Sequence, residues 1–528
     1  MKVLISDNLD EAGIKMFQKE EGFEVDVNVG LSPDELKEII GNYDALIIRS
    51  ATQVTDNLLK DATRLKVIGR AGIGLDNVDI SSASKKGMVV MNTPGGNVVT
   101  TAEHSIALML SLTRNIPLGT SSLKDGRWEK KNLRGKELFN KILGVIGFGK
   151  IGSIVADRAR GLKMQVIVYD PCVTPERIEK AGFQYVSLKE LYKMADYITL
   201  HVPRLKETIG MINKEAFDKM KDGVMIINCA RGGIVKQDDL YEAMKSGKVA
   251  GAALDVFEVE PPGKSPLIGM DRLVCTPHLG ASTQEAQTNV AVAIAGQIID
   301  YLKNGTIINA VNTSSVTGEI IKKLGPFLTL AEKIGCLLAQ LSSWPLKEVV
   351  IDYTGDFKGL DLSPVSIALM KGLLTPVVKD GVNFVNAIIL AKEKGVRVTE
   401  TTNAESEDYL NLITVRAISL ETTSTVAGTL FGKKEPRVVR LNNFRVEMVP
   451  QGHLILINNI DKPGAIGSIG MILGENDINI DLMQVGQEKE GKGERNIIFL
   501  RTDMPIPNDV LEKLRFLPLV KNVTSFEL

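Results

Sequence analysis

The stretch KILGVIGFGKIG, residues 141–152, decides the fold of the central part of this chain. Its apolar first half predicts a buried strand, and GFGKIG (147–152) has the glycine spacing of a turn from a strand into a helix. In such a turn the first glycine permits a tight bend, the second lets backbone N–H groups approach a pyrophosphate, and the third allows close helix packing. The stretch therefore predicts a dinucleotide-binding unit, although taken alone it could be an ordinary strand-to-helix turn.

The next predicted strand supports the dinucleotide interpretation. QVIVYD (165–170) ends in Asp170, 23 residues after Gly147. A carboxylate there can accept hydrogen bonds from both ribose hydroxyls and would repel the 2′-phosphate of NADP. Gly147, Gly149, Gly152 and Asp170 are therefore predicted to bind NAD.

Apolar runs alternate with amphipathic segments on both sides of this unit. Downstream, the runs YITLHVP, GVMIINCARGG, GAALDVF and LVCTPH complete a doubly wound sheet of six strand candidates. Upstream, KVLIS, FEVDVNV, ALIIR and LKVIGR form a similar series without a glycine fingerprint. We expect an α/β fold of two Rossmann-like parallel-sheet lobes, one inserted in the other, with the ligand cleft between them.

A length of 528 residues predicts three or four domains. We expect a substrate-binding lobe (1–97 and 284–312), an NAD-binding domain (98–283), an α/β intervening domain (313–450) and a regulatory domain (451–528). The last has the βαββαβ order of a ferredoxin-like module. Lys433, Lys434 and Arg437 are candidates for an anion site in the intervening domain, although a solvated loop is the safer interpretation.

Composition excludes several classes of protein. There are 63 Lys plus Arg and 64 Asp plus Glu, a net charge of −1, which argues against nucleic-acid binding. The four cysteines stand about 50 residues apart and form no C-x-x-C pair, so neither a disulfide framework nor a metal site is expected. The apolar start MKVLISDNL is too short for a signal sequence, and no 18-residue uncharged run occurs. We expect a soluble, cytoplasmic protein with no membrane partner.

Three side chains at successive predicted strand ends form a candidate catalytic set. His278, in TPHLGA (276–281), follows the last strand of the sheet and is the leading general acid/base. Glu260, in VFEVEP (256–261), could fix the imidazole tautomer and stabilise the imidazolium. Arg231, in NCARGG (228–233), could hold a substrate carboxylate with its planar guanidinium. Taken singly, they could instead be a core histidine, a solvated glutamate and a surface arginine.

The chain contains only three other histidines. His201 ends a predicted strand and either lines the cofactor cleft or is structural. His104 lies inside a predicted buried helix (98–115), where a core or interface position is expected. His453 carries no signal by itself.

Five motifs match a known family in order and spacing. They are GRAGIGLDNVD (69–79), VIGFGKIG (145–152), NCARGGIV (228–235), DVFEVEPP (255–262) and TPHLGAST (276–283). They resemble the D-isomer-specific 2-hydroxyacid dehydrogenases, and the whole chain resembles the long branch that acts in serine biosynthesis. The resemblance implies NAD-dependent oxidation of 3-phospho-D-glycerate to 3-phosphohydroxypyruvate, with Arg231, Glu260 and His278 as the catalytic residues.

The same resemblance implies further binding residues. Arg49 and Arg70 take positions that meet the substrate's phosphate and carboxylate, and Asn97, in NTPGGN (92–97), is a third candidate for substrate contact. In that stretch Gly95 stands where relatives often carry a larger polar residue. The expected cofactor contacts, besides the glycines and Asp170, are Lys150, Ile151, Val202, Cys229, Ala230, Asp255, Leu279, Gly280 and Ala281.

The tail resembles an ACT regulatory domain at its serine-binding positions. Asn459 and Asp461, in NNIDKPG (458–464), could engage the amino group and hydroxyl of L-serine, and Asn479 could reach across a subunit interface. A bare turn with capping asparagines is the alternative. The resemblance implies inhibition by L-serine and a homo-oligomer, either a dimer or a tetramer.

Two other functions stay open. The chain could be a dehydrogenase for another 2-hydroxyacid, such as glyoxylate or lactate, but Arg49, Arg70 and the long tail weigh against this. It could also be an NAD-sensing binding protein without turnover, but the complete set of Arg231, Glu260 and His278 argues against this.

Overall fold

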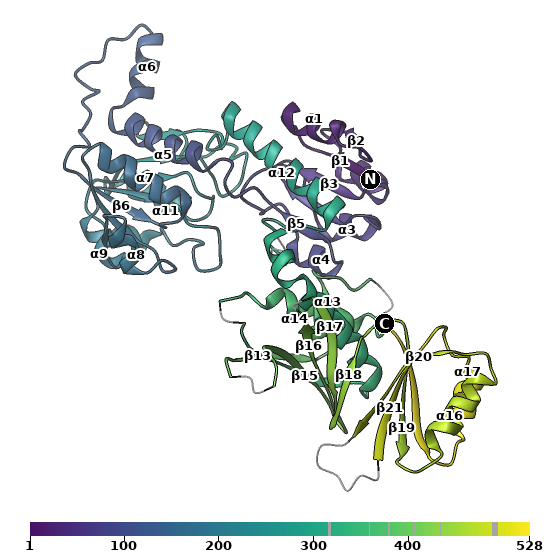
Figure 1. The fold of residues 1–528 in the computed structure, drawn as a ribbon. Helices are drawn as coiled ribbons and strands as arrows, with labels where there is room; N and C mark the ends of the chain where they lie inside the picture. Colours follow the sequence, from purple (N-terminus) through teal and green to yellow (C-terminus); the bar gives the residue numbers. More distant parts are fainter. Residues whose placement is uncertain (315–317, 358, 379–380, 406–407, 433, 488–494) are drawn as a thin grey trace.

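The computed structural model describes residues 1–314, 318–357, 359–378, 381–405, 408–432, 434–487 and 495–528. The described strands form four sheets that follow one another along the chain (Figure 1). The mixed α/β fold class predicted from the sequence is confirmed.

The first sheet is parallel, with strand order β2-β1-β3-β4-β5. Its strands are β1 (Lys2–Ile5), β2 (Glu24–Val27), β3 (Ala45–Ile48), β4 (Val67–Arg70) and β5 (Val89–Met91). The connecting helices are α1 (Glu11–Lys19), α2 (Pro33–Ile39), the short 3-10 helix η1 (Ile40–Asn42), α3 (Asp56–Asp61) and α4 (Ile80–Lys85). Helix α2 begins at Pro33, where the N-cap residue Ser32 and Glu35 in the first turn form a reciprocal capping box.

A helix from much later in the chain completes this first core. Helix α12 (Gln284–Asn304) packs on α1 and β4, and its Val290, Ile294 and Ile298 are buried in the same cluster as Val3 and Val67. Together with the five-stranded sheet and α1 to α4, it forms what we call the first lobe. The first lobe is therefore built from two distant segments of the sequence.

The second sheet is parallel, with order β12-β11-β10-β9-β6-β7-β8. Its strands are β6 (Ile142–Ile146), β7 (Gln165–Tyr169), β8 (Gln184–Tyr185), β9 (Tyr197–Leu200), β10 (Val224–Asn228), β11 (Val249–Leu254) and β12 (Leu273–Cys275). The order reverses between β6 and β9, and a crevice at the carboxyl ends of the strands is expected at such a switch point.

Seven helices accompany the second sheet, and with it they form the second lobe. They are α5 (Val98–Thr113), α6 (Ile116–Lys124), α7 (Lys150–Gly161), α8 (Pro175–Lys180), α9 (Leu188–Met194), α10 (Lys214–Lys219) and α11 (Gln237–Lys245). Helix α6 projects from the rest of this lobe (Figure 1). The sequence interpretation missed α6 and β8. Strand β8 has two residues and is therefore too short to show the alternating pattern of a strand.

The third sheet has the order β14-β13-β15-β16-β17-β18 and is antiparallel except between β13 and β14. Its strands are β13 (Leu346–Gly355), β14 (Arg397–Asn403), β15 (Asn411–Ser419), β16 (Thr423–Phe431), β17 (Glu435–Leu441) and β18 (Phe444–Met448). The helices are α13 (Gly318–Leu341), α14 (Ser363–Leu374) and α15 (Ala387–Glu393). Between Lys323 and Leu341, α13 is long and apolar enough to cross a membrane by length and composition, but it packs on α14 and β16 as a core helix.

The fourth sheet is antiparallel, with order β20-β21-β19-β22. It consists of β19 (His453–Ile460), β20 (Ile480–Gln487), β21 (Arg495–Thr502) and β22 (Val520–Glu527), with α16 (Ala465–Gly474) and α17 (Asn508–Arg515). This is the βαββαβ order of a ferredoxin-like module, as the sequence predicts. We call this unit the terminal module.

Candidate active site

The glycine turn lies directly after β6, at the switch point of the second sheet. Gly147 has φ of +94°, in the region that glycine alone adopts readily. A Cβ on Gly152 would lie 2.0 Å from the carbonyl oxygen of Gly147, whereas a Cβ on Gly149 would meet nothing within 4 Å. The turn is therefore tight against its own helix at Gly152 and open at Gly149, which suits a backbone cradle for a pyrophosphate.

Asp170 lies just beyond β7 and faces this turn. Its Oδ2 accepts from the backbone N–H of Phe148 at 2.6 Å, and its Oδ1 accepts from Cys172 and Val173 at 2.7 and 3.1 Å. These bonds hold the carboxylate beside the glycine turn, where an adenosine ribose could reach it. The residues therefore fit a bound NAD.

The other predicted cofactor residues lie at two places in the second lobe. Lys150 and Ile151 open α7, and Lys150 Nζ reaches the carbonyl oxygen of Pro94 at 3.5 Å. The rest follow the carboxyl ends of β9 to β12: Val202, Cys229, Ala230, Asp255, Leu279, Gly280 and Ala281. Burial raises the pKa of the Cys229 thiol to about 12, so this thiol stays protonated near neutral pH.

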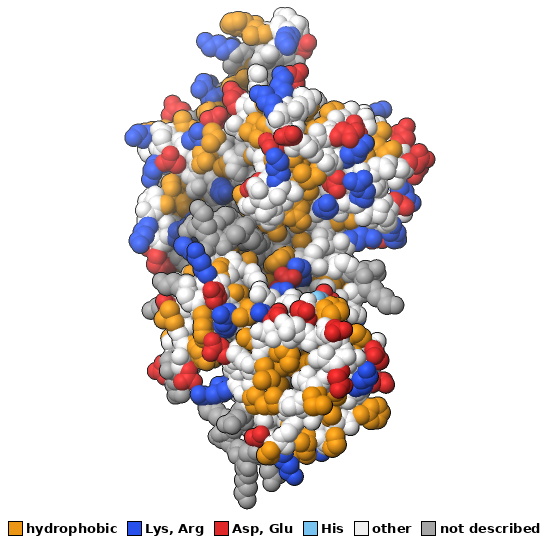
Figure 2. Space-filling view, turned by 45° about the vertical axis from the view of Figure 1, so that its right-hand side comes forward, with side chains coloured by type: hydrophobic (Ala, Val, Ile, Leu, Met, Phe, Trp, Pro, Cys, Tyr) orange, Lys and Arg blue, Asp and Glu red, His pale blue; other side chains and the backbone are white. Residues whose placement is uncertain are grey.

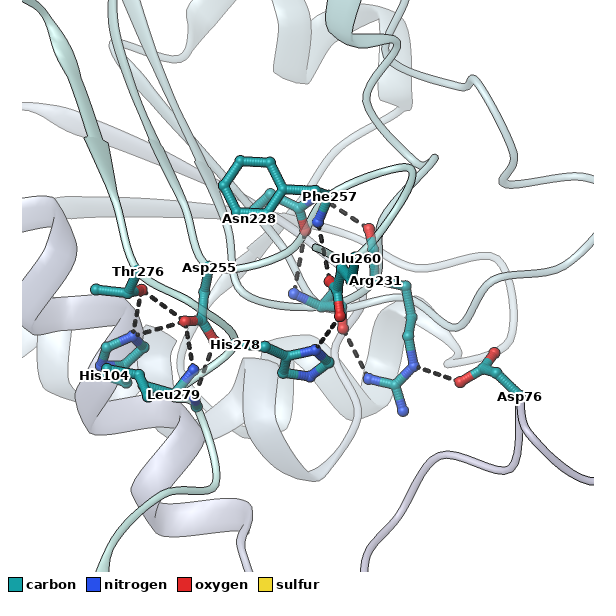
Figure 3. A network of polar contacts seen from close by, with 12 residues as sticks. Asp76, His104, Asn228, Arg231, Asp255, Phe257, Glu260, Thr276, His278 and Leu279 are labelled. Carbon is teal, nitrogen blue, oxygen red and sulfur yellow. Dashed lines mark hydrogen bonds and ion pairs between the residues drawn. The ribbon is translucent and has the colours of Figure 1, made fainter. Parts of the chain in front are cut away.

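His278 and Glu260 form a direct pair (Figure 3). Imidazole Nδ1 lies 2.7 Å from Glu260 Oε2, and Glu260 Oε1 accepts from the backbone N–H of Phe257 at 3.0 Å. The carboxylate can thus hold a proton on Nδ1 and leave the lone pair of Nε2 for a substrate. His278 has φ of +56°, an uncommon backbone conformation for a residue with a side chain.

Arg231 follows β10, and its guanidinium spans the two lobes. Its Nε donates to Asp76 Oδ2 of the first lobe at 3.0 Å, and its Nη1 donates to the carbonyl oxygen of Ala230 at 2.7 Å. A Cβ on Gly74 would lie 2.1 Å from Arg231 Nη2, so that glycine leaves space for the guanidinium. In Figure 3, Arg231 and His278 extend from the carboxyl edge of the sheet toward the same space.

The first lobe adds two more arginines near Arg231. Burial and the charge of Arg231 lower the pKa of Arg70 to about 10. Arg70 Nε donates to the carbonyl oxygen of Arg49 at 3.3 Å, and Arg49 Nη1 donates to the carbonyl oxygen of Asn8 at 3.1 Å. Mutually repelling cations gathered at one place suit a multiply charged anion.

Asn97 lies where the first lobe joins α5. It is 9% exposed, and its Oδ1 has no hydrogen-bond partner among the described residues. An orphaned buried amide oxygen is a group that a ligand could satisfy. No bond connects it to the three arginines in the part of the chain that the structure describes.

A second polar cluster lies beside the pair and was missed from the sequence. Asp255 is buried, and its carboxylate accepts from Thr276 Oγ1, His104 Nε2 and the backbone of Leu279 and Gly280. Burial alone would raise the pKa of Asp255, but these bonds hold it below its usual value. The signal that could have found the cluster is the polar pair Thr101 and His104, three residues apart and on one face of a largely apolar helix.

His201 is not part of the catalytic pair. Burial lowers its pKa to about 3, and its Nε2 lies 2.9 Å from Thr199 Oγ1. A Cβ on Gly147 would lie 2.5 Å from the carbonyl oxygen of His201, so this residue packs under the glycine turn as a neutral side chain.

Two of the candidate effector residues, Asp461 and Asn479, do not meet within one chain. Asp461 follows the end of β19, which pairs with Arg495, whereas Asn479 precedes β20, which starts opposite Thr502. Thr502 and Arg495 are the two ends of β21, so the two positions lie roughly 20 Å apart along the sheet. Asn459 is 2% exposed, and its Oδ1 lacks a hydrogen-bond partner in the described residues.

The structure gives little support for an anion site at the basic residues of the intervening domain. Lys433 lies outside the described residues, and Arg437 pairs with Glu435 at 3.0 Å. Among the residues that the structure describes, no group of three or more His, Cys, Asp or Glu side chains could hold a metal ion.

Comparison with known proteins places this geometry in a family. Residues 106–280 match the D-isomer specific 2-hydroxyacid dehydrogenase, NAD binding domain, residues 323–442 the D-3-phosphoglycerate dehydrogenase intervening domain, and residues 453–519 the ACT domain. D-lactate dehydrogenase from Aquifex aeolicus, solved with NAD and lactic acid, is 30% identical with a TM-score of 0.52, covering 59% of this chain and 100% of its own.

Two full-length relatives are more similar. The D-3-phosphoglycerate dehydrogenase of Archaeoglobus fulgidus is 43% identical over 100% of both chains. That of Bacillus subtilis is 41% identical, covering 100% of this chain and 99% of its own. The chain therefore belongs to the D-3-phosphoglycerate dehydrogenase family of NAD-dependent 2-hydroxyacid dehydrogenases.

Proposed function

We propose that this chain oxidises the C2 hydroxyl of 3-phospho-D-glycerate to give 3-phosphohydroxypyruvate, the first step of phosphorylated serine biosynthesis. The observation that carries the proposal is the His278–Glu260 pair at 2.7 Å beside Arg231, in a chain similar over its full length to D-3-phosphoglycerate dehydrogenases. Bound NAD supplies the hydride acceptor.

His278 acts as the base of this reaction. Its Nε2 takes the C2 hydroxyl proton, because Glu260 occupies Nδ1 and stabilises the imidazolium that results. In the reverse direction the same imidazolium returns the proton to the alkoxide. Because alcohol oxidation by NAD is uphill near neutral pH, we expect the isolated enzyme to run faster as a reductase.

The arginines bind the two anionic ends of the substrate. Arg231 holds the carboxylate, and Asp76 on its Nε fixes the plane of the guanidinium. Arg49 and Arg70 are proposed to meet the phosphate and the carboxylate, and Asn97 is a third candidate for substrate contact. The cofactor is held by the turn from Gly147 to Gly152, with Asp170 at the ribose.

A substrate panel with the purified protein tests this proposal. We expect NADH oxidation with phosphohydroxypyruvate at a kcat/KM well above that with glyoxylate or pyruvate. Activity on glyoxylate or pyruvate without activity on phosphohydroxypyruvate would reject the substrate. NADH binding without turnover on any of the three would favour a sensing protein.

The terminal module is proposed to bind L-serine as an inhibitor between two copies of the chain. Because Asp461 and Asn479 lie at opposite ends of one sheet, a serine that uses both needs Asn479 from a second subunit. Hydrophobic side chains exposed on this module (Figure 2), among them Ile466 and Met471 of α16, are consistent with a partner there. We propose that the chain forms a homo-oligomer, either a dimer or a tetramer. We also propose that it acts in the cytoplasm, where the reducing environment keeps thiols such as its four free cysteines reduced.

The serine proposal has its own test. Asn479→Ala should abolish inhibition by L-serine and leave basal turnover unchanged, since Asn479 is exposed and far from the catalytic pair. Glu475→Gln, an exposed change beyond the end of α16, is the matched control and should be inhibited normally. Normal inhibition of the Asn479 variant would remove this residue from the effector site.

A further inference from the structure

The loop that carries the catalytic histidine is held by a carboxylate that does not touch the imidazole. The backbone N–H of His278 donates to the carbonyl oxygen of Asp255 at 2.9 Å. The Asp255 side chain then accepts from the next two N–H groups, Leu279 at 2.7 Å and Gly280 at 2.8 Å. Three successive residues are thus bound to one aspartate.

These hydrogen bonds hold the loop in a strained backbone conformation. His278 has φ of +56°, and a residue with a side chain keeps such a conformation only where its surroundings impose it. If the loop relaxed, the ring would move relative to Glu260, and the 2.7 Å contact would lengthen. The position of the proposed base therefore depends on the orientation of the Asp255 carboxylate.

His104 of α5 and Thr276, which follows β12, fix that carboxylate. His104 Nε2 lies 3.2 Å from Asp255 Oδ1 and 3.1 Å from Thr276 Oγ1, and Thr276 Oγ1 donates to the same carboxylate oxygen at 2.6 Å. One turn earlier on α5, Thr101 Oγ1 donates to the carbonyl oxygen of Gly280 at 3.0 Å. Figure 3 shows His104, Thr276 and Asp255 as one connected group beside the His278 loop.

Hydrogen bonding fixes the state of the imidazole in this group. Thr276 gives its single proton to Asp255, so its oxygen can only accept from His104, and the carboxylate also only accepts. His104 must therefore carry a proton on Nε2. The ring faces the carboxylate of Asp255, just beyond β11, while the neighbouring Glu103 of α5 pairs with Arg158 of α7.

We propose that His104 is a positioning residue for catalysis, which orients the His278 loop through its Nε2 proton, Thr276 and the Asp255 carboxylate. The proposal rests on the proposed function, since it assumes that His278 is the base. It assigns a role in turnover to a helix residue that contacts neither the imidazole nor Glu260.

Two replacements of His104 separate positioning from packing. His104→Leu removes the donor, and we expect kcat for phosphohydroxypyruvate reduction to fall about tenfold, as for loss of a hydrogen bond to a charged group. The KM of the keto acid should stay within about twofold, and the isotope effect with deuterated NADH should rise, because the chemical step becomes slower. His104→Gln, which can place an N–H at a similar reach, should restore kcat to within about threefold of wild type.

A second route keeps the test decisive if His104→Leu folds poorly. Thr276→Val removes the hydroxyl between His104 and Asp255, and it should lower kcat in the same way. Combined with His104→Gln, its effect should be less than the product of the two single effects, since both act through one carboxylate. Glu103→Gln changes a residue on the same helix as His104 and breaks its surface ion pair with Arg158 of α7; it is the control and should keep wild-type kcat.

Several results would overturn the proposal. They are wild-type kcat in His104→Leu, equal loss in the Leu and Gln variants, or a rise in KM without a fall in kcat. Failure of the proposed function looks different: wild type would lack activity on phosphohydroxypyruvate. The same variants would then be compared on whichever keto acid is reduced.

Discussion

Replacement of Glu260 by glutamine tests the catalytic pair most directly. Glu260 uses both oxygens as acceptors, Oε2 toward His278 Nδ1 at 2.7 Å and Oε1 toward the Phe257 N–H at 3.0 Å. A glutamine has only one acceptor. If its oxygen stays on Phe257, its NH2 faces Nδ1, which moves the ring proton to Nε2 and removes the lone pair that takes the substrate proton.

The flipped amide is no better. It sets an NH2 against the Phe257 N–H, which costs about 1–3 kcal/mol for the unsatisfied donor. Both orientations also lose the attraction between carboxylate and imidazolium, about 1 kcal/mol at 4 Å in water and more in a lower dielectric. Because the side chains of His278 and Glu260 are 47% and 37% exposed, the value for water, about 1 kcal/mol, applies to this attraction. The sum, about 2–4 kcal/mol, predicts a fall in kcat of roughly 30- to 1000-fold.

NADH absorbance with saturating phosphohydroxypyruvate measures the effect. Glu258→Gln is the matched control, because it changes an exposed carboxylate in the same loop that bonds the Gln237 N–H at 2.8 Å, away from the imidazole. We expect the control to stay within about twofold of wild type. A Glu260→Gln enzyme as fast as this control would refute the reasoning, because the carboxylate would then neither fix the tautomer nor stabilise the imidazolium.

Four further predictions follow from the site. His278→Asn should cost about 10²- to 10⁴-fold in kcat with NADH affinity preserved, as measured by fluorescence titration; preserved turnover would exclude His278 as the base. Asp170→Ala should lower the affinity for NAD and reduce the preference for NAD over NADP. An unchanged ratio of kcat/KM for the two cofactors would contradict this role. Asp76→Ala removes the ion pair on Arg231 Nε and leaves the Nη1 bond to the Ala230 carbonyl oxygen, so the KM of the keto acid should rise by up to about fivefold, the worth of a half-exposed ion pair; an unchanged KM counts against Asp76 as an orienting residue. Gly152→Ala would place a Cβ 2.0 Å from the Gly147 carbonyl oxygen, so the turn should be distorted and the KM for NADH should rise. The free energy of unfolding measured in urea should change less than the free energy of NADH binding. Normal NADH binding would show that the turn can widen without losing the cofactor.

Local patterns predicted the elements of this protein well. The GFGKIG spacing identified β6 and α7 because glycine requirements in a turn are set by neighbours a few residues away. The fold class, NAD as cofactor and the family are confirmed. The residue roles and domain boundaries stay predictions.

Contacts between distant segments could not be predicted in the same way. Asp76 and Arg231 are 155 residues apart, and nothing in either motif indicates that their side chains meet. His104 looked like a core residue because its helix is apolar, yet its ring bonds Asp255, 151 residues later. Asp461 and Asn479 lie close in sequence, but the strand order puts them at opposite ends of one sheet.

The return of α12 to the first lobe has a consequence for synthesis of the chain. The segment from β1 to β5 leaves the ribosome before α12, so it at first lacks the Val290, Ile294 and Ile298 side chains that close its core. At translation rates of about 5–20 residues per second, roughly 10–40 s pass before Asn304 is made. During that time the sheet lacks its α12 cover and exposes apolar surface that a chaperone could bind, so of the two lobes the first is the later to be completed.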